Sequence, residues 1–344
     1  MALGGLLPDT TIVHIGIVIV ATGVIWIGSG WLEDGAETIA RYHGLPAVIQ
    51  GSIVIAIGSS FPELSSVVFA ALVGAFDLGV GAIVGSAIFN VLVIPAVAAI
   101  ATENPLASSR TLVYKEAQFY MIAVAALIIT LALAVIYFPI PGPTLSGRLT
   151  RALALLPLAL YGLYIFIQWQ DFGDSSEPIQ QEGVRIRREW VRLGLGLLLI
   201  LVAVEQLVGA VEGLNHTFGI PEFLGGVSIL AAATSLPDTL VSVRAAREGR
   251  AVTSLGNVLG SNTFDLLVAI PVGVLIAGSA PVNFAVAIPM LGVLTVATIL
   301  LFAMLRTDLE LSDLESYFLL GAYAVFIVWV IAETIGLTDL IRGI

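Results

Sequence analysis

The chain has 344 residues, of which 58% are hydrophobic and only 11% charged, with a net charge of −11. Soluble domains contain about 45–50% apolar and about 25% charged residues, so a soluble enzyme and a disordered tail are excluded. The sequence has no basic stripe and no cysteine. It therefore excludes a nucleic-acid binder, disulfides, thiolate zinc sites and cysteine nucleophiles.

Uncharged windows such as 10–32 and 78–102 are long enough to cross a bilayer. The first window follows a start without the basic segment of a cleaved signal peptide, so we interpret it as a transmembrane helix. Apolar runs separated by charges and Gly/Pro clusters predict an all-α integral membrane protein of ten transmembrane helices. These helices are expected near 11–31, 45–73, 78–102, 117–138, 152–169, 191–212, 221–246, 251–277, 282–305 and 315–335.

Lys and Arg residues are unevenly distributed between alternate loops. If the N-terminus is outside, 11 of them fall in cytoplasmic loops and 3 fall outside. The positive-inside rule therefore favours a multi-pass cell-membrane protein with its N-terminus outside, and ten spans return the C-terminus to the same side.

The sequence also contains an internal repeat with an ungapped offset of 175 residues. The offset aligns Glu37 with Glu212, Gly44 with Gly219, Pro62 with Pro237, Gly85 with Gly260, Ser86 with Ser261 and Phe89 with Phe264. We expect an N-terminal five-helix repeat over 1–170, a short cytoplasmic linker over 171–190 and a C-terminal five-helix repeat over 191–344. Because five is odd, equivalent helices cross in opposite directions, which is typical of secondary transporters with a site between the halves.

Two equivalent segments, 58–63 and 233–238, interrupt the apolar pattern with a proline and an acid. Proline lacks an N–H group and frees a carbonyl one turn earlier. Hydroxyl residues precede each acid by three and four positions: Ser59 and Ser60 before Glu63, and Thr234 and Ser235 before Asp238. Hard oxygen donors on one helix face favour calcium and sodium.

Proline kinks and hydroxyl residues are common in membrane helices, so either segment alone has a structural explanation. An acid at the helix centre, however, costs about 2.5–3.5 kcal/mol on insertion scales. Two acids at equivalent positions therefore favour a functional site. Glu37 and Glu212 lie near predicted loops, and we interpret them as solvated helix ends, with a role in an ion vestibule as the alternative.

A second pair of segments, 85–90 and 260–265, places a serine four residues before a polar side chain. Ser86 precedes Asn90, and Ser261 precedes Asp265, so each pair shares one helix face. The glycines of these segments permit close helix packing. We expect the glycines to pack while the polar face lines the site.

The strings GSSFPEL, GVGAIVGSAIFN, TSLPD and GSNTFD resemble the alpha repeats of the sodium/calcium exchanger, or cation/calcium antiporter, superfamily. In detail they are similar to the potassium-dependent sodium/calcium exchanger branch and its prokaryotic relatives. The resemblance places the first alpha repeat at about 44–95 and the second at about 219–271. Its ten-span plan covers essentially the whole chain.

The resemblance implies that calcium is held by the carboxylates of Glu63 and Asp238 and by the backbone carbonyls of Ser59 and Thr234. It implies overlapping sodium or potassium sites built from Ser60, Ser86, Ser235, Ser261 and the carbonyls of Ala56 and Ala231, with Asn90 and Asp265 at the centre. Asp238 departs from the Glu that many sodium/calcium exchangers have, but it suits the potassium-dependent branch.

Together, Glu63, Asp238 and Asp265 carry up to three negative charges, of which one calcium ion balances two. A proton on Asp265 or a bound potassium ion would balance the third. We therefore expect a calcium/sodium antiporter, with potassium co-transport as a variant and a calcium/proton antiporter as the alternative.

Two further classes are disfavoured by the sequence. An intramembrane aspartyl protease would need GxGD motifs, which Asp238 and Asp265 lack. A cation channel usually gains its symmetry from several chains. We expect no enzymatic activity, no cofactor other than transported Ca²⁺, Na⁺ and K⁺ or H⁺, and no partner beyond these ions and the lipid bilayer.

Overall fold

The computed structural model describes residues 10–43, 56–102, 105–142, 145–170, 185–338 and 341. Residues 44–55, with the start of the second expected helix and of the first alpha repeat, lie outside this part. So do residues 171–184 of the expected linker.

The described residues form an all-helical membrane protein. Its long helices are α1 (Thr11–Tyr42), α4 (Phe76–Leu92) followed by α5 (Ile94–Ile100), the π-helix η2 (Leu112–Ala117) followed by α6 (Gln118–Tyr137), α7 (Arg151–Gln170), α8 (Ile186–Phe218), α12 (Ala251–Phe264) followed by η4 (Asp265–Ala269) and α13 (Ile270–Ala277), α14 (Phe284–Arg306) and α15 (Asp313–Thr334). The shorter helices are α2 (Ala56–Ser59), α3 (Phe61–Val73), α9 (Glu222–Gly225), η3 (Gly226–Leu230), α10 (Ala231–Thr234) and α11 (Leu236–Arg247).

Eight of these described helices are long and apolar enough to cross a membrane. A ninth candidate is the pair Glu222–Thr234 and Leu236–Arg247, which is bent by 44°. The expected ten would require α2 and α3 to complete a further span with residues that precede Ala56.

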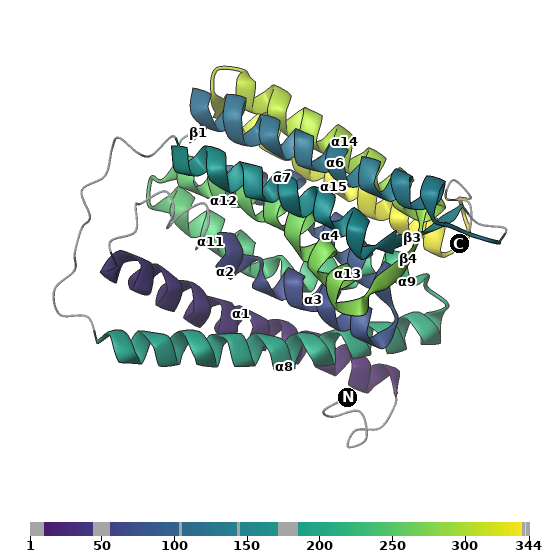
Figure 1. The fold of residues 1–344 in the computed structure, drawn as a ribbon. Helices are drawn as coiled ribbons and strands as arrows, with labels where there is room; N and C mark the ends of the chain where they lie inside the picture. Colours follow the sequence, from purple (N-terminus) through teal and green to yellow (C-terminus); the bar gives the residue numbers. More distant parts are fainter. Residues whose placement is uncertain are drawn as a thin grey trace.

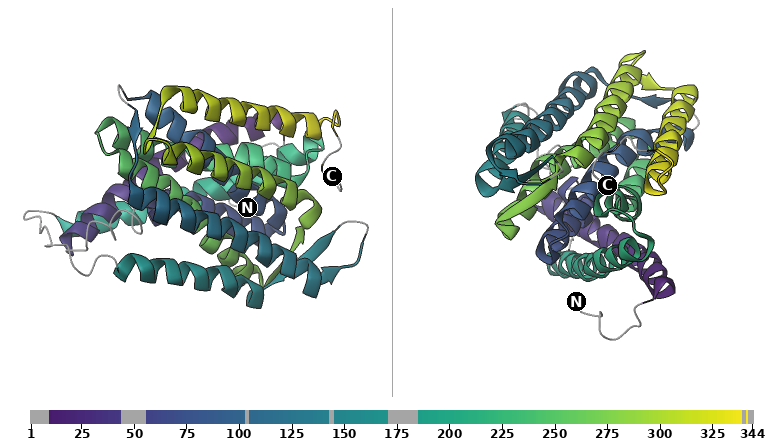
Figure 2. Two further views of the ribbon diagram at one scale, coloured as in Figure 1. Left: turned by 90° about the horizontal axis from the view of Figure 1, so that it is seen from above. Right: turned by 90° about the vertical axis from the view of Figure 1, so that its right-hand side faces the viewer.

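Helices α1 and α8 pack side by side along one flank of the bundle, and α15 lies on the opposite side (Figures 1 and 2). Gly28 and Gly196 allow the close approach, because a Cβ added at Gly196 would lie 2.7 Å from the carbonyl oxygen of Gly28. The outer side of α1 is apolar and exposed, with Ile12 83% exposed. Such a surface is stable against lipid rather than water.

Helix α1 extends eleven residues beyond its expected end, to Tyr42 instead of 31. The charges that ended the apolar pattern are accommodated within the helix by ion pairs. Arg41 pairs with Glu37 one turn away, and Arg192 of α8 lies 2.6 Å from Asp34. A helix can therefore continue past the apolar stretch that predicts it.

Helix α4 occupies the centre of the molecule, and every residue of it except Asp77 and Phe89 is buried. Where α4 crosses the α9–η3 segment, the backbones of the two segments are in direct contact. A Cβ added at Gly81 would overlap the carbonyl oxygen of Phe223, and one at Gly85 would overlap that of Val227. The two alpha-repeat segments therefore meet through glycines, as small-residue packing in membranes favours.

Short strands, which the hydropathy pattern did not predict, join loops at the two ends of the bundle. Strands β2 (Pro139–Ile140), β3 (Ser146–Thr150) and β4 (Ser279–Asn283) form an antiparallel sheet in the order β2-β3-β4, with Gly147 opposite Val282. Strand β1 (Leu106–Ala107) pairs with β5 (Glu310–Leu311) at the other end (Figure 1). Both pairings satisfy loop backbone groups and connect the first half of the chain to the second.

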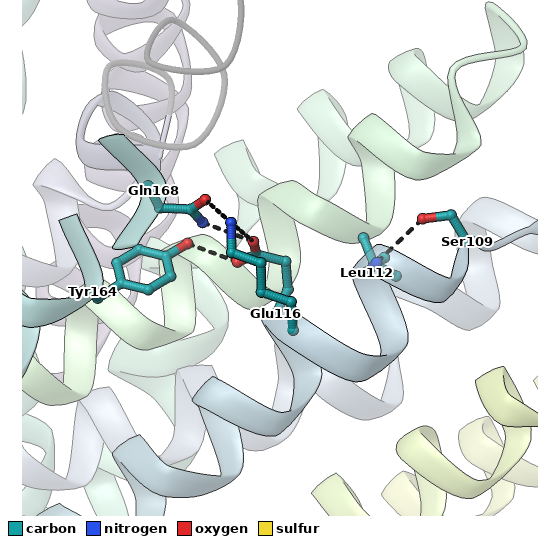
Figure 3. A network of polar contacts seen from close by, with 6 residues as sticks. Ser109, Leu112, Glu116, Tyr164 and Gln168 are labelled. Carbon is teal, nitrogen blue, oxygen red and sulfur yellow. Dashed lines mark hydrogen bonds and ion pairs between the residues drawn. The ribbon is translucent and has the colours of Figure 1, made fainter. Parts of the chain in front are cut away.

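A polar network connects the start of the η2–α6 helix to the end of α7 (Figure 3). The hydroxyl of Tyr164 and the amide of Gln168 donate to the carboxylate of Glu116, at 2.8 and 2.7 Å. Lys115 donates to the amide oxygen of Gln168 at 2.6 Å. The network satisfies a charged pair at the helix ends and fixes α7 against α6.

Candidate functional site

Two helices break near the middle of the bundle, as the prolines predict. The first breaks at Ser60, between α2 and α3, and the second at Ser235, between α10 and α11. Pro62 and Pro237 occupy the first turns of α3 and α11, where a missing N–H costs nothing. Each break therefore begins a new helix inside the protein.

The two acids of the repeat, Glu63 and Asp238, lie in the first turns of these new helices and are fully buried. A helix N-terminus favours negative charge, because its first N–H groups have no partner within the helix. Glu63 lies within electrostatic range of both Asp238 and Asp265. The structure thus brings three carboxylates together between the two halves.

Equivalent serines hydrogen-bond to the two acids. Ser86 of α4 donates to Oε1 of Glu63 at 3.4 Å, and Ser261 of α12 donates to Oδ1 of Asp238 at 3.1 Å. Hydroxyl pairs then connect the halves: Ser235 donates to Ser86 at 2.7 Å, and Ser59 lies 3.0 Å from Ser261. The predicted serines therefore form a continuous network with the acids.

Asn90 lies at the centre of this network. Its Nδ2 donates to Oδ2 of Asp238 at 3.2 Å and to Oδ1 of Asn262 at 2.9 Å. Asn262 in turn donates to the carbonyl of Ala87 and to the hydroxyl of Tyr120, both at 3.2 Å. One amide network thus reaches from α4 through α12 to α6.

Several buried oxygen atoms of the site have no hydrogen-bond partner among the described residues. They are both carboxylate oxygens of Asp265, Oε2 of Glu63, Oδ1 of Asn90 and the hydroxyl oxygen of Ser60. Buried polar atoms are normally paired, so a group of unpaired acceptors requires an explanation. Calcium and sodium bind carboxylate, amide and hydroxyl oxygens, and either cation would supply the missing partner.

Backbone carbonyls expected to bind ions are only partly available. The carbonyl of Ala231, at the start of α10, accepts the N–H of Ser235 at 3.0 Å and the hydroxyl of Thr234 at 3.3 Å. An ion at Ala231 would compete with these two donors. Ala56 occupies the corresponding position at the start of α2.

Three residues near the site were not predicted. Asn262 aligns with Ala87 in the repeat, so the comparison of halves gave it no weight. Tyr120 lies in an apolar helix with no motif around it. Glu33 was assigned to a loop, but it lies on α1 with its Cγ 3.6 Å from a Cβ added at Gly58, and it is within electrostatic range of Asp238.

The buried oxygen atoms of the candidate site are not all acidic. Among the described residues, no group of three or more His, Asp or Glu side chains has the geometry to hold one metal ion. A cation placed among these oxygens would take neutral oxygens as well as carboxylates as its ligands.

Two curated relatives of this chain are named as an antiporter and as an exchanger. The putative antiporter CaxA of Alkalimonas amylolytica is 32% identical over 282 residues, which cover 79% of this chain and 82% of CaxA. Human sodium/potassium/calcium exchanger 5 is 24% identical over 330 residues, covering 67% of this chain and 63% of that protein.

The fold is also similar to a solved structure. The sodium-calcium exchanger NCX_Mj matches with a TM-score of 0.64 and 24% identity, over 93% of this chain and 99% of that one. A family model described as sodium/calcium exchanger protein matches residues 13–170 and 189–332. Because that model spans most of the sequence, the chain belongs to the sodium/calcium exchanger protein family.

Proposed function

We propose that the chain exports calcium in exchange for sodium by alternating access. The family consists of exchangers and antiporters, so the chain is a multi-pass membrane transporter and not an enzyme. Family membership supports cation/calcium antiport. The choice of sodium as the driving ion is the proposal.

The observation that carries the proposal is the arrangement of Glu63 and Asp238. The acids begin two broken helices, are fully buried, and each accepts a hydrogen bond from an equivalent serine. Buried charge without a partner is strongly unfavourable in a membrane interior. An empty site should therefore change faces poorly, and calcium or replacing sodium ions should allow the change, which produces exchange.

Within this proposal, calcium is held by the carboxylates of Glu63 and Asp238 and by the carbonyls of Ser59 and Thr234. Sodium or potassium uses the remaining oxygens in overlapping positions: Ser60, Ser86, Asn90, Ser235, Ser261, Asp265 and the carbonyls of Ala56 and Ala231. The short distances within the hydroxyl network support overlapping sites, because hydroxyls of the two halves lie within 3.0 Å of each other.

We further propose ten spans in two inverted five-helix repeats, over 1–170 and 191–344, joined by the linker 171–190. Helix bounds support this arrangement. Shifted by 175 residues, α1 (Thr11–Tyr42) would begin at 186, where α8 begins, and α2 (Ala56–Ser59) would coincide with α10 (Ala231–Thr234). Inverted repeats place the site at the interface of the two halves, where the carboxylates lie.

A calcium/proton antiporter is the second candidate, and Asp265 is the observation that favours it. Both oxygens of this buried carboxylate are unpartnered among the described residues. Protonation would remove its charge and provide a donor. The same observation fits a bound potassium ion, so the coupling ion must be determined by flux measurements.

The experiment is calcium uptake into sodium-loaded vesicles that contain the purified protein. Glu63→Gln and Asp238→Asn should each reduce sodium-driven uptake by about a hundredfold or more, because each removes a charged ligand from a site that screens charge poorly. Glu310→Gln, a change at an exposed acid of β5, is the matched control and should transport normally.

Sodium, potassium and proton gradients are then varied separately. Uptake driven by sodium supports the main proposal, and uptake driven only by protons supports the second candidate. Sodium-driven uptake that persists in both site variants would exclude Glu63 and Asp238 from the mechanism.

A further inference from the structure

A pocket separate from the central site lies where α8 ends and α9 begins. Its volume is about 180 Å³, which is enough for several water molecules. It is lined by Glu212, Asn215, His216, Gly219, Ile220 and Glu222. Gly219, with φ 66°, ends α8 in the left-handed conformation and lets the chain turn back into α9. The turn holds the end of one helix beside the start of the next.

Asn215 provides an unpaired polar side chain in this pocket. The residue is only 3% exposed, and neither Oδ1 nor Nδ2 has a hydrogen-bond partner among the described residues. Its carboxamide lies directly against Gly225, since a Cβ added at Gly225 would overlap it. A buried amide without a hydrogen-bond partner is unfavourable, so a ligand or a water molecule that paired with it would be stabilising.

The pocket is also strongly acidic. Glu222 lies within electrostatic range of Glu212, and Asp77 at the start of α4 lies within range of Glu222. One carboxylate oxygen of Asp77 is buried without a hydrogen-bond partner among the described residues. No ion pair found in the described part of the chain involves any of these three acids. His216 is the basic side chain that acts on Glu222, so the three acids carry more negative charge than this basic group can balance.

The equivalent position in the first half is neutralised. The 175-residue offset aligns Glu212 with Glu37 and His216 with Arg41. Arg41 forms an ion pair with Glu37. In the second half, a histidine replaces this permanent cation. The same offset aligns Asn215 with Ala40 and Glu222 with Ala47, so both additional oxygen ligands occur only in the second half.

We propose that this pocket is a second calcium site, which binds calcium at one mouth of the protein as the ion passes to or from Glu63 and Asp238. No three acidic or histidine side chains of the described residues can chelate one ion, so the bound calcium keeps part of its water shell. The segment from Glu222 to Thr234 would span about 18 Å as a helix. The pocket and the central site thus lie at opposite ends of one half-helix. The inference rests on the proposed calcium transport.

The transport test compares the KM for calcium at each membrane face in oriented vesicles. Glu222→Gln, and His216→Arg, which copies the Glu37–Arg41 arrangement, should raise KM by about three- to tenfold at the pocket face. Vmax and the KM at the opposite face should stay within about twofold. Glu310→Gln, which removes an exposed acid of β5 outside the pocket, is the control and should leave the KM at the pocket face unchanged. Equal changes at both faces, or no change in KM, would overturn the proposal.

A binding test separates this pocket from diffuse surface charge and does not depend on transport. Equilibrium dialysis with radioactive calcium in concentrated choline chloride is performed on the Glu63→Gln/Asp238→Asn double variant. We expect one weak residual site that is lost when Glu222→Gln is added. Absence of a residual site, or a residual site insensitive to Glu222→Gln, would refute the pocket. If calcium binding depends on Glu222 but the wild-type protein gives no sodium-driven calcium flux, the proposed function is refuted and the pocket is not.

Discussion

At the residue scale, the central site has more negative charge than one calcium ion can balance. Asp238 accepts hydrogen bonds from Ser261 and Asn90, which stabilise its ionised form. Neither carboxylate oxygen of Asp265 has a hydrogen bond of ordinary geometry among the described residues, and the hydroxyl of Ser60 is the polar group beside it. The acids therefore differ in environment, and Asp265 is the one suited to take up a proton or a monovalent ion.

We predict that Asp265→Asn keeps a measurable fraction of calcium transport but flattens its dependence on potassium or on pH. The amide keeps the shape of the side chain and removes the charge that requires neutralisation. Calcium uptake is measured in vesicles over a range of potassium concentrations and pH values. Asn90 is the equivalent position in the first repeat and is already an amide, so the variant makes the halves alike. Identical potassium and pH profiles in variant and parent would contradict this role.

The sequence predicted these residues to different degrees, and the reason is physical. Glu63, Asp238, Ser86 and Ser261 were proposed as site residues because a repeated polar residue inside an apolar helix is energetically costly and therefore informative, and the structure places each serine beside its acid. Asn262 could not be found in this way, because the first half has Ala87 at that position. Its contacts with Asn90 and Tyr120 depend on how α4, α6 and α12 cross, which hydropathy does not describe.

At the scale of helices, the site depends on how closely α4 approaches the α9–η3 segment. Gly81 and Gly85 place the α4 backbone directly against the carbonyl groups of Phe223 and Val227. This contact positions Ser86 so that it reaches both Glu63 and Ser235. Because glycine has only a hydrogen atom as its side chain, the two backbones approach so closely that a methyl group does not fit between them.

We predict that Gly85→Ala lowers stability by about 1–3 kcal/mol or more, because the added methyl group would overlap the carbonyl of Val227. Transport should fall with it, since Ser86 would move relative to Glu63. Gly292→Ala in α14 is the matched control, because no atom lies within 4 Å of an added Cβ there. The control should be neutral or slightly stabilising, since alanine favours helix. Thermal unfolding of the purified proteins gives the comparison, and equal melting temperatures for the two variants would contradict the packing argument.

Helix ends were the least predictable elements. Hydropathy ends α1 at the first charges, whereas the ion pairs of Asp34 and Glu37 let it continue to Tyr42. The short strand pairings were not predicted, because two-residue strands such as β1 and β5 have no alternating pattern. Their partners are distant in sequence, so only the packed bundle brings them together.

At the scale of the whole molecule, the two proposed repeats differ in the hydrogen bonds that equivalent residues make. An exact two-fold relation would pair Thr234 with Ser86 as Ser59 pairs with Ser261. Instead Ser235, the next residue, bonds to Ser86. Alternating access requires equivalent helices of the two repeats to adopt different arrangements, so that the site is open to one side of the membrane at a time.

The orientation in the membrane is the remaining whole-molecule prediction, and the cysteine-free sequence makes it directly testable. Leu145, 55% exposed, lies at the end of the bundle that carries the β2-β3-β4 sheet, and Glu248 lies in the loop between α11 and α12. Because Arg250 lies in the same loop and Arg244 and Arg247 lie in the last turn of α11 beside it, the positive-inside rule places this loop in the cytoplasm. Single-cysteine variants Leu145→Cys and Glu248→Cys are treated with a membrane-impermeant maleimide. We expect labelling of Leu145→Cys in intact cells and of Glu248→Cys only after permeabilisation, with no labelling of the parent chain. The opposite pattern would put both termini inside and would turn the acidic pocket at Glu212 and Glu222 toward the cytoplasm.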